Sequence, residues 1–151
     1  EAVILAFNRP EIRAVGVPGG GGFATASALA LFYQALLHGG NDKATLWSQS
    51  TLTDARRIRS GDFTDALFKK SANRALGLIV SGDDSRRFRG FGRSNSSSAF
   101  GHNGAGGQLA WADPKTGLSL AYVTPGHDRN GIRQGSRGVA IGTLAAQCLA
   151  D

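Results

Sequence analysis

The chain has 151 residues, of which 41% are hydrophobic and 19% are charged. This composition excludes a disordered protein and predicts one globular domain with a sizeable core. No apolar run approaches the ~20 residues that a membrane span requires. The formal net charge of +6 indicates a solvated basic face or an acidic partner. The single cysteine, Cys148, excludes an internal disulfide, and its neighbours Leu144 and Ala145 predict a buried thiol.

The start of the chain has little regular pattern. The sequence begins at Glu1 and contains no methionine, so we expect a processed or truncated part of a longer protein. Residues 1–17 alternate weakly between short apolar runs and polar breaks, which we interpret as a strand or an irregular leading segment. Glycines at positions 19–22 then interrupt regular structure.

The clearest helix is predicted over residues 25–38. Thr25 or Ser27 can cap its start, and Gly39 with Gly40 can end it. Apolar residues recur between these points at helical spacing: Leu29, Phe32, Tyr33, Leu36 and Leu37. The following region is mixed, with a short helix expected near residues 53–59. A further turn or two is expected to carry Phe63, Leu67 and Phe68 on one face.

The second half of the chain predicts strands and a closing helix. Residues 76–80 are typical of a buried strand, and the polar, basic residues 81–98 of a surface loop. Three extended segments follow at 99–103, 107–112 and 118–124, and the last two form an antiparallel hairpin around the Pro-Gly turn at 113–117. A helix is expected over 131–150, where Gly135, Gly138 and Gly142 indicate close approach to the strands. The order indicates an α+β fold with an antiparallel sheet flanked by helices.

The most informative stretch is 100–107, which reads FGHNGAGG. Four glycines around His102 on a predicted strand sacrifice side-chain packing, and a common reason is the close approach of a ligand to the backbone. A backbone N–H there could stabilise negative charge on a substrate oxygen, while His102 offers a titratable group. A glycine-rich bulge with a surface histidine is the alternative.

This stretch and the QLAWADPKTGLSLAYVT that follows resemble the third-motif strand and hairpin of serine hydrolases related to β-lactamases and penicillin-binding proteins. The group includes class C β-lactamases, family VIII carboxylesterases and D-aminopeptidases. The segment GGGGFATASALALFYQALLHGG is similar to a second recurrent segment of these proteins. The resemblance implies that residues 1–151 are a single partial domain, the C-terminal half of the α/β domain of this fold.

The resemblance also implies the site residues. His102, Asn103 and Gly104 occupy the place of the Lys-Thr-Gly triplet of β-lactamases, and the Ala105 N–H becomes an oxyanion-hole donor. Such hydrolases take their nucleophile from Ser-x-x-Lys and assist it with Tyr-x-Asn or Ser-x-Asn. This chain contains no Ser-x-x-Lys and no Tyr-x-Asn. The only formal Ser-x-Asn match, at 71–73, lies after the segment where that element belongs, and we attribute it to chance.

We therefore expect the chain alone to be inactive and its partner to be the missing N-terminal part of the same protein. The expected substrate is a small ester or amide. His102 in place of lysine removes a permanent cation, which favours esterase or peptidase activity over recognition of a β-lactam carboxylate.

Several other motifs have weaker claims. The literal triplet Lys115-Thr116-Gly117 is better explained as a hairpin turn. The Gly-x-Gly before the first helix resembles a dinucleotide fingerprint, but no βαβ order follows it. Residues 86–93 interleave arginine with phenylalanine, so the alternative function is a non-catalytic module whose basic loop binds nucleic acid, although a solvated loop is the preferred interpretation. No Cys/His cluster is present, so neither a metal nor a cofactor is expected.

Overall fold

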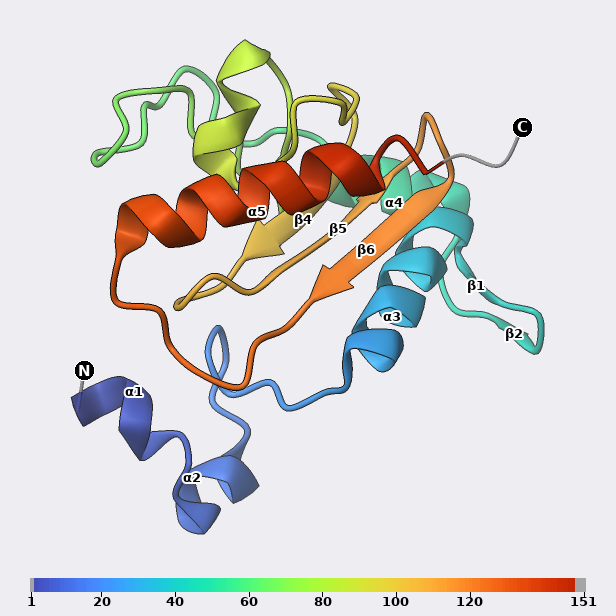
Figure 1. Ribbon diagram of the computed structural model, residues 1–151. Helices are drawn as coiled ribbons and strands as arrows, with labels where there is room; N and C mark the ends of the chain where they lie inside the picture. Colours follow the sequence, from blue (N-terminus) through green and yellow to red (C-terminus); the bar gives the residue numbers. More distant parts are fainter. Residues whose placement is uncertain (1, 149–151) are drawn as a thin grey trace.

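The computed structural model describes residues 2–148. Its centre is a four-stranded antiparallel sheet whose strands lie side by side in chain order, and Figure 1 labels the last three of them. Helix α3 (Ala26–His38) packs on one face of this sheet and helix α5 (Gly131–Ala145) on the other. The predicted α+β class, with an antiparallel sheet flanked by helices, is confirmed.

All four predicted strands form, with bounds that differ from the predicted ones by up to a few residues. They are β3 (Ile79–Val80), β4 (Phe100–Asn103), β5 (Leu109–Asp113) and β6 (Leu118–Tyr122). The turn between β5 and β6 closes when the Gly117 N–H donates to the Asp113 carbonyl at 2.8 Å, and Gly117 has a φ of 73°. Lys115-Thr116-Gly117 is therefore a hairpin turn, as expected.

Strand alternation divides the core between the two sheet faces. Ala110 and Ala112 of β5 pack with Tyr33 and Leu37 of α3 on one face. On the other face Trp111 belongs to the cluster that reaches the end of α5. The hypothetical Cβ of Gly138 would lie 3.1 Å from Leu109 and that of Gly142 3.5 Å from Nε1 of Trp111, which confirms close approach to β5 at these two glycines. The Cβ of Gly142 would also lie 3.0 Å from the Gly92 nitrogen. A Cβ on Gly135 would meet nothing within 4 Å.

Helix α3 confirms the predicted helix and its signals. The Thr25 hydroxyl accepts a hydrogen bond from the Ala28 N–H at 3.1 Å, and Gly39 ends the helix with a φ of 90°. A short hairpin of β1 (Gly40–Asn41) and β2 (Ala44–Thr45) follows. The next helix, α4 (Gln49–Ala55), starts earlier than predicted because Ser48 caps it by accepting from the Thr51 N–H.

The interpretation of residues 1–17 as a strand or irregular segment was wrong. Two short helices form there, α1 (Ala2–Ala6) and α2 (Pro10–Val15), and they lie apart from the sheet (Figure 1). Pro10 stands at the first turn of α2, where its fixed φ suits a helix and its missing N–H costs nothing. The left-handed Gly16 ends α2.

Three further predictions need correction. The strand at 76–80 shortens to Ile79–Val80, because Gly77 has a φ of 65° in a turn where the Ala75 N–H donates to the Leu78 carbonyl. Residues 65–69 form a single turn and not a helix: the Lys69 N–H donates to the Asp65 carbonyl at 2.9 Å, and the Asp65 carboxylate accepts from the N–H groups of two following residues. Cys148 is exposed and not buried: α5 ends at Ala145, and the Cys148 thiol donates to the Leu144 carbonyl at 3.4 Å. Residues 149–150 of the predicted helix lie outside the described residues.

The segment 81–98 is more than a surface loop. It contains a 3-10 helix, η1 (Asp84–Arg89), and it buries Phe91 on the α5 side of the sheet. Asn95 is also buried, and its side-chain oxygen accepts from the Gly92 N–H. Polar and basic residues predicted exposure, but the Arg89 side chain is folded inward. Among residues 2–148, no helix has the length and apolar character needed to cross a membrane.

Candidate functional site

The open edge of β4 is the geometric centre of the candidate site. Strand β3 pairs only with Phe100 and Gly101, so the same edge of β4 is uncovered at His102 and Asn103. On its other side β4 pairs with β5 over its whole length, with His102 opposite Ala110. Because side chains alternate, His102 and Asn103 point to opposite faces of the sheet.

His102 has a defined hydrogen-bonding arrangement. Its Nδ1 lies 2.6 Å from the Asn103 carbonyl oxygen, and its Nε2 lies 3.3 Å from Nη1 of Arg74. A guanidinium can only donate and a carbonyl can only accept, so in this arrangement Nδ1 donates to the Asn103 carbonyl and Nε2 accepts from Arg74. The side chain is exposed, which leaves the ring edge accessible from solvent.

Arg74 is the neighbour of His102 that the sequence did not reveal. Its Nη2 lies 3.9 Å from Oδ2 of Asp65. The Phe68 and Leu67 N–H groups, followed by the Arg74 charge, lower the pKa of Asp65, so this carboxylate partly balances the cation. No spacing signal connects Arg74 with a histidine 28 positions later. Arg74 and His102 meet because β3, which follows Arg74 in the chain, pairs with β4, which carries His102.

The turn after β4 exposes a backbone amide that has no acceptor among residues 2–148. The Gly104 N–H donates to the Gln108 carbonyl at 2.8 Å, and Gly106 and Gly107 have φ values of 84° and 99°. These left-handed conformations are accessible to glycine at little cost, which explains the Gly-Gly pair. Ala105 is exposed, and no atom of residues 2–148 accepts a hydrogen bond from its N–H.

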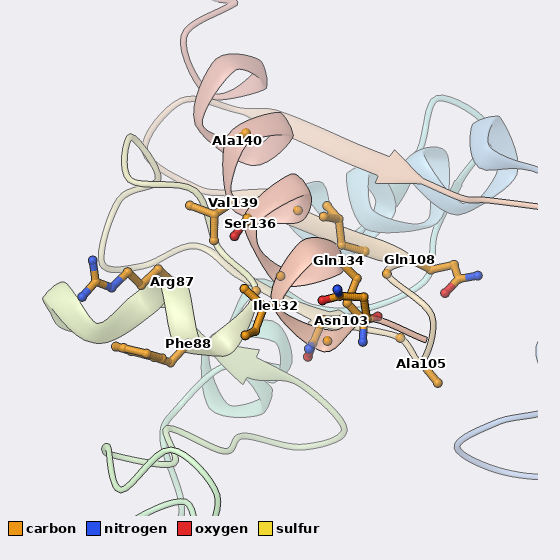
Figure 2. Close-up of a pocket in the computed structure, with 18 of the residues that line it drawn as sticks. Arg87, Phe88, Asn103, Ala105, Gln108, Ile132, Gln134, Ser136, Val139 and Ala140 are labelled. Atoms are coloured by element: carbon orange, nitrogen blue, oxygen red, sulfur yellow. The ribbon is translucent and has the colours of Figure 1, made fainter. Parts of the chain in front are cut away.

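A groove of about 1770 Å³ runs between this turn and α5. Figure 2 shows Asn103, Ala105 and Gln108 on one wall and Ile132, Gln134 and Val139 of α5 on the other. Three of the four predicted site residues, Asn103, Gly104 and Ala105, line it. His102 does not, because it lies on the α3 face of the sheet.

A smaller hollow of about 250 Å³ adjoins the groove, and Asn103 lines both. Arg74 and Asp65 also line the smaller hollow. Asn103 packs closely on the end of η1, since a Cβ on Gly90 would lie 2.9 Å from the Asn103 Cβ. The groove and the hollow therefore meet at the strand that carries the predicted triplet.

The basic loop gives the nucleic-acid hypothesis no support. Arg89 is buried and donates to the carbonyls of Ser81 and Ser71 and to Asp83. Arg86 donates to the Asn95 and Asp83 carbonyls. Two of the arginines that suggested a phosphate-binding surface are therefore used to hold the loop itself. Among the described residues, no group of three or more His, Cys, Asp or Glu side chains could hold a metal ion.

Comparison with known proteins places this geometry in a family. The family model described as Beta-lactamase matches residues 3–141, which is most of the chain. The chain belongs to the β-lactamase family. The resemblance inferred from the strand around His102 and from the helix before it is thereby confirmed.

Individual β-lactamase family members agree with this assignment. The esterase/β-lactamase LipL of Mycobacterium tuberculosis is 33% identical over 108 residues, which cover 71% of this chain and 23% of LipL. A β-lactamase crystal structure from Mycobacterium bovis is 26% identical with a TM-score of 0.65, covering 80% of this chain and 43% of that one. The structure of EstA from Arthrobacter nitroguajacolicus is 28% identical with a TM-score of 0.62, covering 97% and 39%. The chain thus spans less than half the length of each of these relatives.

Proposed function

We propose that this chain forms one wall of the active site of a serine hydrolase that cleaves small esters or amides by acyl transfer. The observation that carries the proposal is the exposed Ala105 amide, which has no acceptor among residues 2–148 and lies beside the open edge of β4. A fixed N–H of this kind stabilises the charge that develops on a carbonyl oxygen, and one such donor is worth about 10²–10³ in kcat.

In the proposed reaction the serine comes from residues outside this chain. Its hydroxyl oxygen attacks the carbonyl carbon while a base takes the proton, and the Ala105 N–H holds the resulting oxyanion. The tetrahedral species then expels an alcohol or amine, and water releases the acid from the acyl-serine. His102 orients the substrate or assists proton transfer, with its Nε2 exchanging Arg74 for a substrate hydrogen bond. Asn103 and Gly104 shape the groove wall beside the turn.

We further propose that residues 1–151 are a single partial domain completed by another part of the same protein. Two observations support this. The chain spans 23% of LipL and 39% of EstA, and its groove of about 1770 Å³ exceeds the ~300–1,000 Å³ of a small-molecule pocket. A second segment can therefore cover part of the groove and still leave room for substrate. The isolated chain is expected to be inactive.

The substrate preference follows from the third-motif residue. His102 lacks the permanent cation of lysine, and the Arg74 charge beside it is partly balanced by Asp65. Esters and simple amides are therefore favoured over β-lactams, whose carboxylate would need that cation.

The test is to compare hydrolysis of p-nitrophenyl esters and of a chromogenic cephalosporin by the intact protein, with the isolated 151-residue chain as the control. We expect ester turnover by the intact protein and none by the chain. Much faster cephalosporin turnover would overturn the esterase preference, and catalysis by the isolated chain would refute the external serine.

A further inference from the structure

The turn that carries Ala105 is enclosed from two sides by residues far away in the sequence. On one side is the loop after β6. The Asp128 N–H lies 3.4 Å from the Gly106 carbonyl oxygen and donates to it. A Cβ on Gly106 would lie 2.8 Å from Nδ1 of His127 and 3.0 Å from its Cα. The loop backbone therefore packs directly against the turn.

On the other side is Arg137 of α5. A Cβ on Gly107 would lie 2.6 Å from Nη2 of Arg137 and 3.1 Å from the Cβ of Gln134. The guanidinium thus rests against the backbone of Gly107, in space that any larger residue would fill. Gly107 also has a φ of 99°, a backbone conformation that favours glycine, so a larger residue there would be strained and would displace the guanidinium.

One carboxylate links these two sides. Asp128 Oδ2 accepts from Nη1 of Arg137 at 3.0 Å, and both Asp128 oxygens accept from Arg133, at 2.7 and 3.0 Å. The Asp128 side chain is only 9% exposed. Hydrogen bonds from Arg133 first, then from the Asn130 N–H and from Arg137, lower the pKa of Asp128. The carboxylate is therefore ionised and fixed at neutral pH.

We infer that the Asp128–Arg137 ion pair is a positioning device that holds the Gly104–Gly107 turn so that the Ala105 amide stays directed at the reacting carbonyl. This inference rests on the proposed function. Asp128 holds the turn through its backbone N–H, and Arg137 holds it by contact with Gly107. The ion pair fixes these two supports relative to each other. Neither side chain needs to touch the substrate.

The kinetic test uses Arg137→Gln and Asp128→Asn in the intact protein with a neutral p-nitrophenyl ester. Displacing an oxyanion donor weakens transition-state binding more than substrate binding, so we expect kcat to fall about 10–100-fold with KM changed less than about threefold. Arg137→Lys, which keeps the charge, should recover part of kcat. The matched control is Arg57→Gln, which removes an exposed ion pair with Asp54 away from the turn, and it should leave kcat unchanged.

A second readout separates this inference from the proposed function. The backbone amide resonances of Ala105, Gly106 and Gly107 should shift in Arg137→Gln and Asp128→Asn, and should not shift in Arg57→Gln. If the wild type hydrolyses no ester or amide, the proposed function fails, while the amide shifts still decide whether the ion pair holds the turn. If the wild type is active and both variants keep kcat within about threefold, the inference is wrong. Should Arg137→Gln not fold, Asp128→Asn and Arg137→Lys decide the outcome by the same criteria.

Discussion

Individual glycines in this chain have opposite roles that their sequence context does not distinguish. A Cβ on Gly101 would lie 2.2 Å from the Ala110 carbonyl oxygen and 2.6 Å from the Trp111 Cα, both of them backbone atoms of the neighbouring strand. A Cβ on Gly135 would meet nothing within 4 Å on the surface of α5. The first glycine is required by strand packing, and the second only weakens a helix.

Replacing these two glycines by alanine should therefore change stability in opposite directions. Gly101→Ala forces β4 away from β5 and should lower the free energy of unfolding by about 1–3 kcal/mol or more. Gly135→Ala should raise it by about 0.5–1 kcal/mol, because alanine loses less backbone entropy in a helix. Urea denaturation measures both. Equal effects of the two substitutions would contradict the packing argument.

At the scale of elements, η1 is held by polar contacts rather than by an apolar face. Asp83 caps it by accepting from the Ser85 N–H at 2.8 Å and pairs with Arg89 at 2.8 Å. Hydrogen bonds from the Ser85 side chain first and then from Arg89 lower the pKa of Asp83 to about 2. The same contacts hold the segment 81–98, which packs Phe91 against the α5 face of the sheet.

The free energy of unfolding should depend on pH through the ionisation of Asp83, the residue that caps η1. An unfolded aspartate has a pKa of about 3.9, so the folded state with a pKa of about 2 is favoured while the carboxylate is charged. The stabilisation is present above about pH 4 and is lost as the pH falls towards 2. Asp83→Asn should be less stable than wild type at pH 7, and the difference should shrink below pH 4.

Urea midpoints between pH 7 and pH 2.5 provide the measurement. Asp84→Asn is the matched control, because that side chain is fully exposed one position later. A constant difference between wild type and Asp83→Asn at every pH would show that the cap does not depend on charge.

At the scale of the whole molecule, the sheet separates two apolar clusters. Phe100 and the alanines of β5 pack against α3, while Trp111 packs with Phe91 and Ala146 on the opposite face. Trp111 is 1% exposed and is the largest fully buried side chain among the described residues. The packing on the α5 face of the sheet therefore depends on Trp111 more than on any other side chain, and this face also supports the groove.

Trp111→Ala should lower the free energy of unfolding by about 3–5 kcal/mol, through lost burial and the cavity that remains. Leu46→Ala is the control, since Leu46 is 57% exposed and its loss should change stability by less than about 0.5 kcal/mol. Thermal unfolding followed by circular dichroism compares the two variants. A loss below about 1 kcal/mol for Trp111→Ala would mean that the α5 face is not a cooperative core.

Much of the fold and part of the candidate site could be predicted because they depend on local patterns. Helix α3 has its cap, its periodic apolar face and its stop within consecutive residues, and the β5–β6 hairpin has alternation around a Pro-Gly turn. The stretch around His102 stood out because glycines in a strand are rare, and its assignment as the third-motif triplet rested on the family resemblance. The two N-terminal helices were missed because each is too short for its periodicity to exceed that of an irregular segment.

The amino-acid sequence by itself determined the sheet, the two covering helices and the glycine-rich strand of a β-lactamase family member, because hydrophobic period and turn chemistry act between near neighbours. Only the tertiary structure decided that Arg74 meets His102, that the basic loop turns Arg86 and Arg89 inward, and that Asp128 and Arg137 enclose the turn of Ala105. Such contacts join residues distant along the chain. Long polar side chains find these partners only after the backbone has brought the segments together.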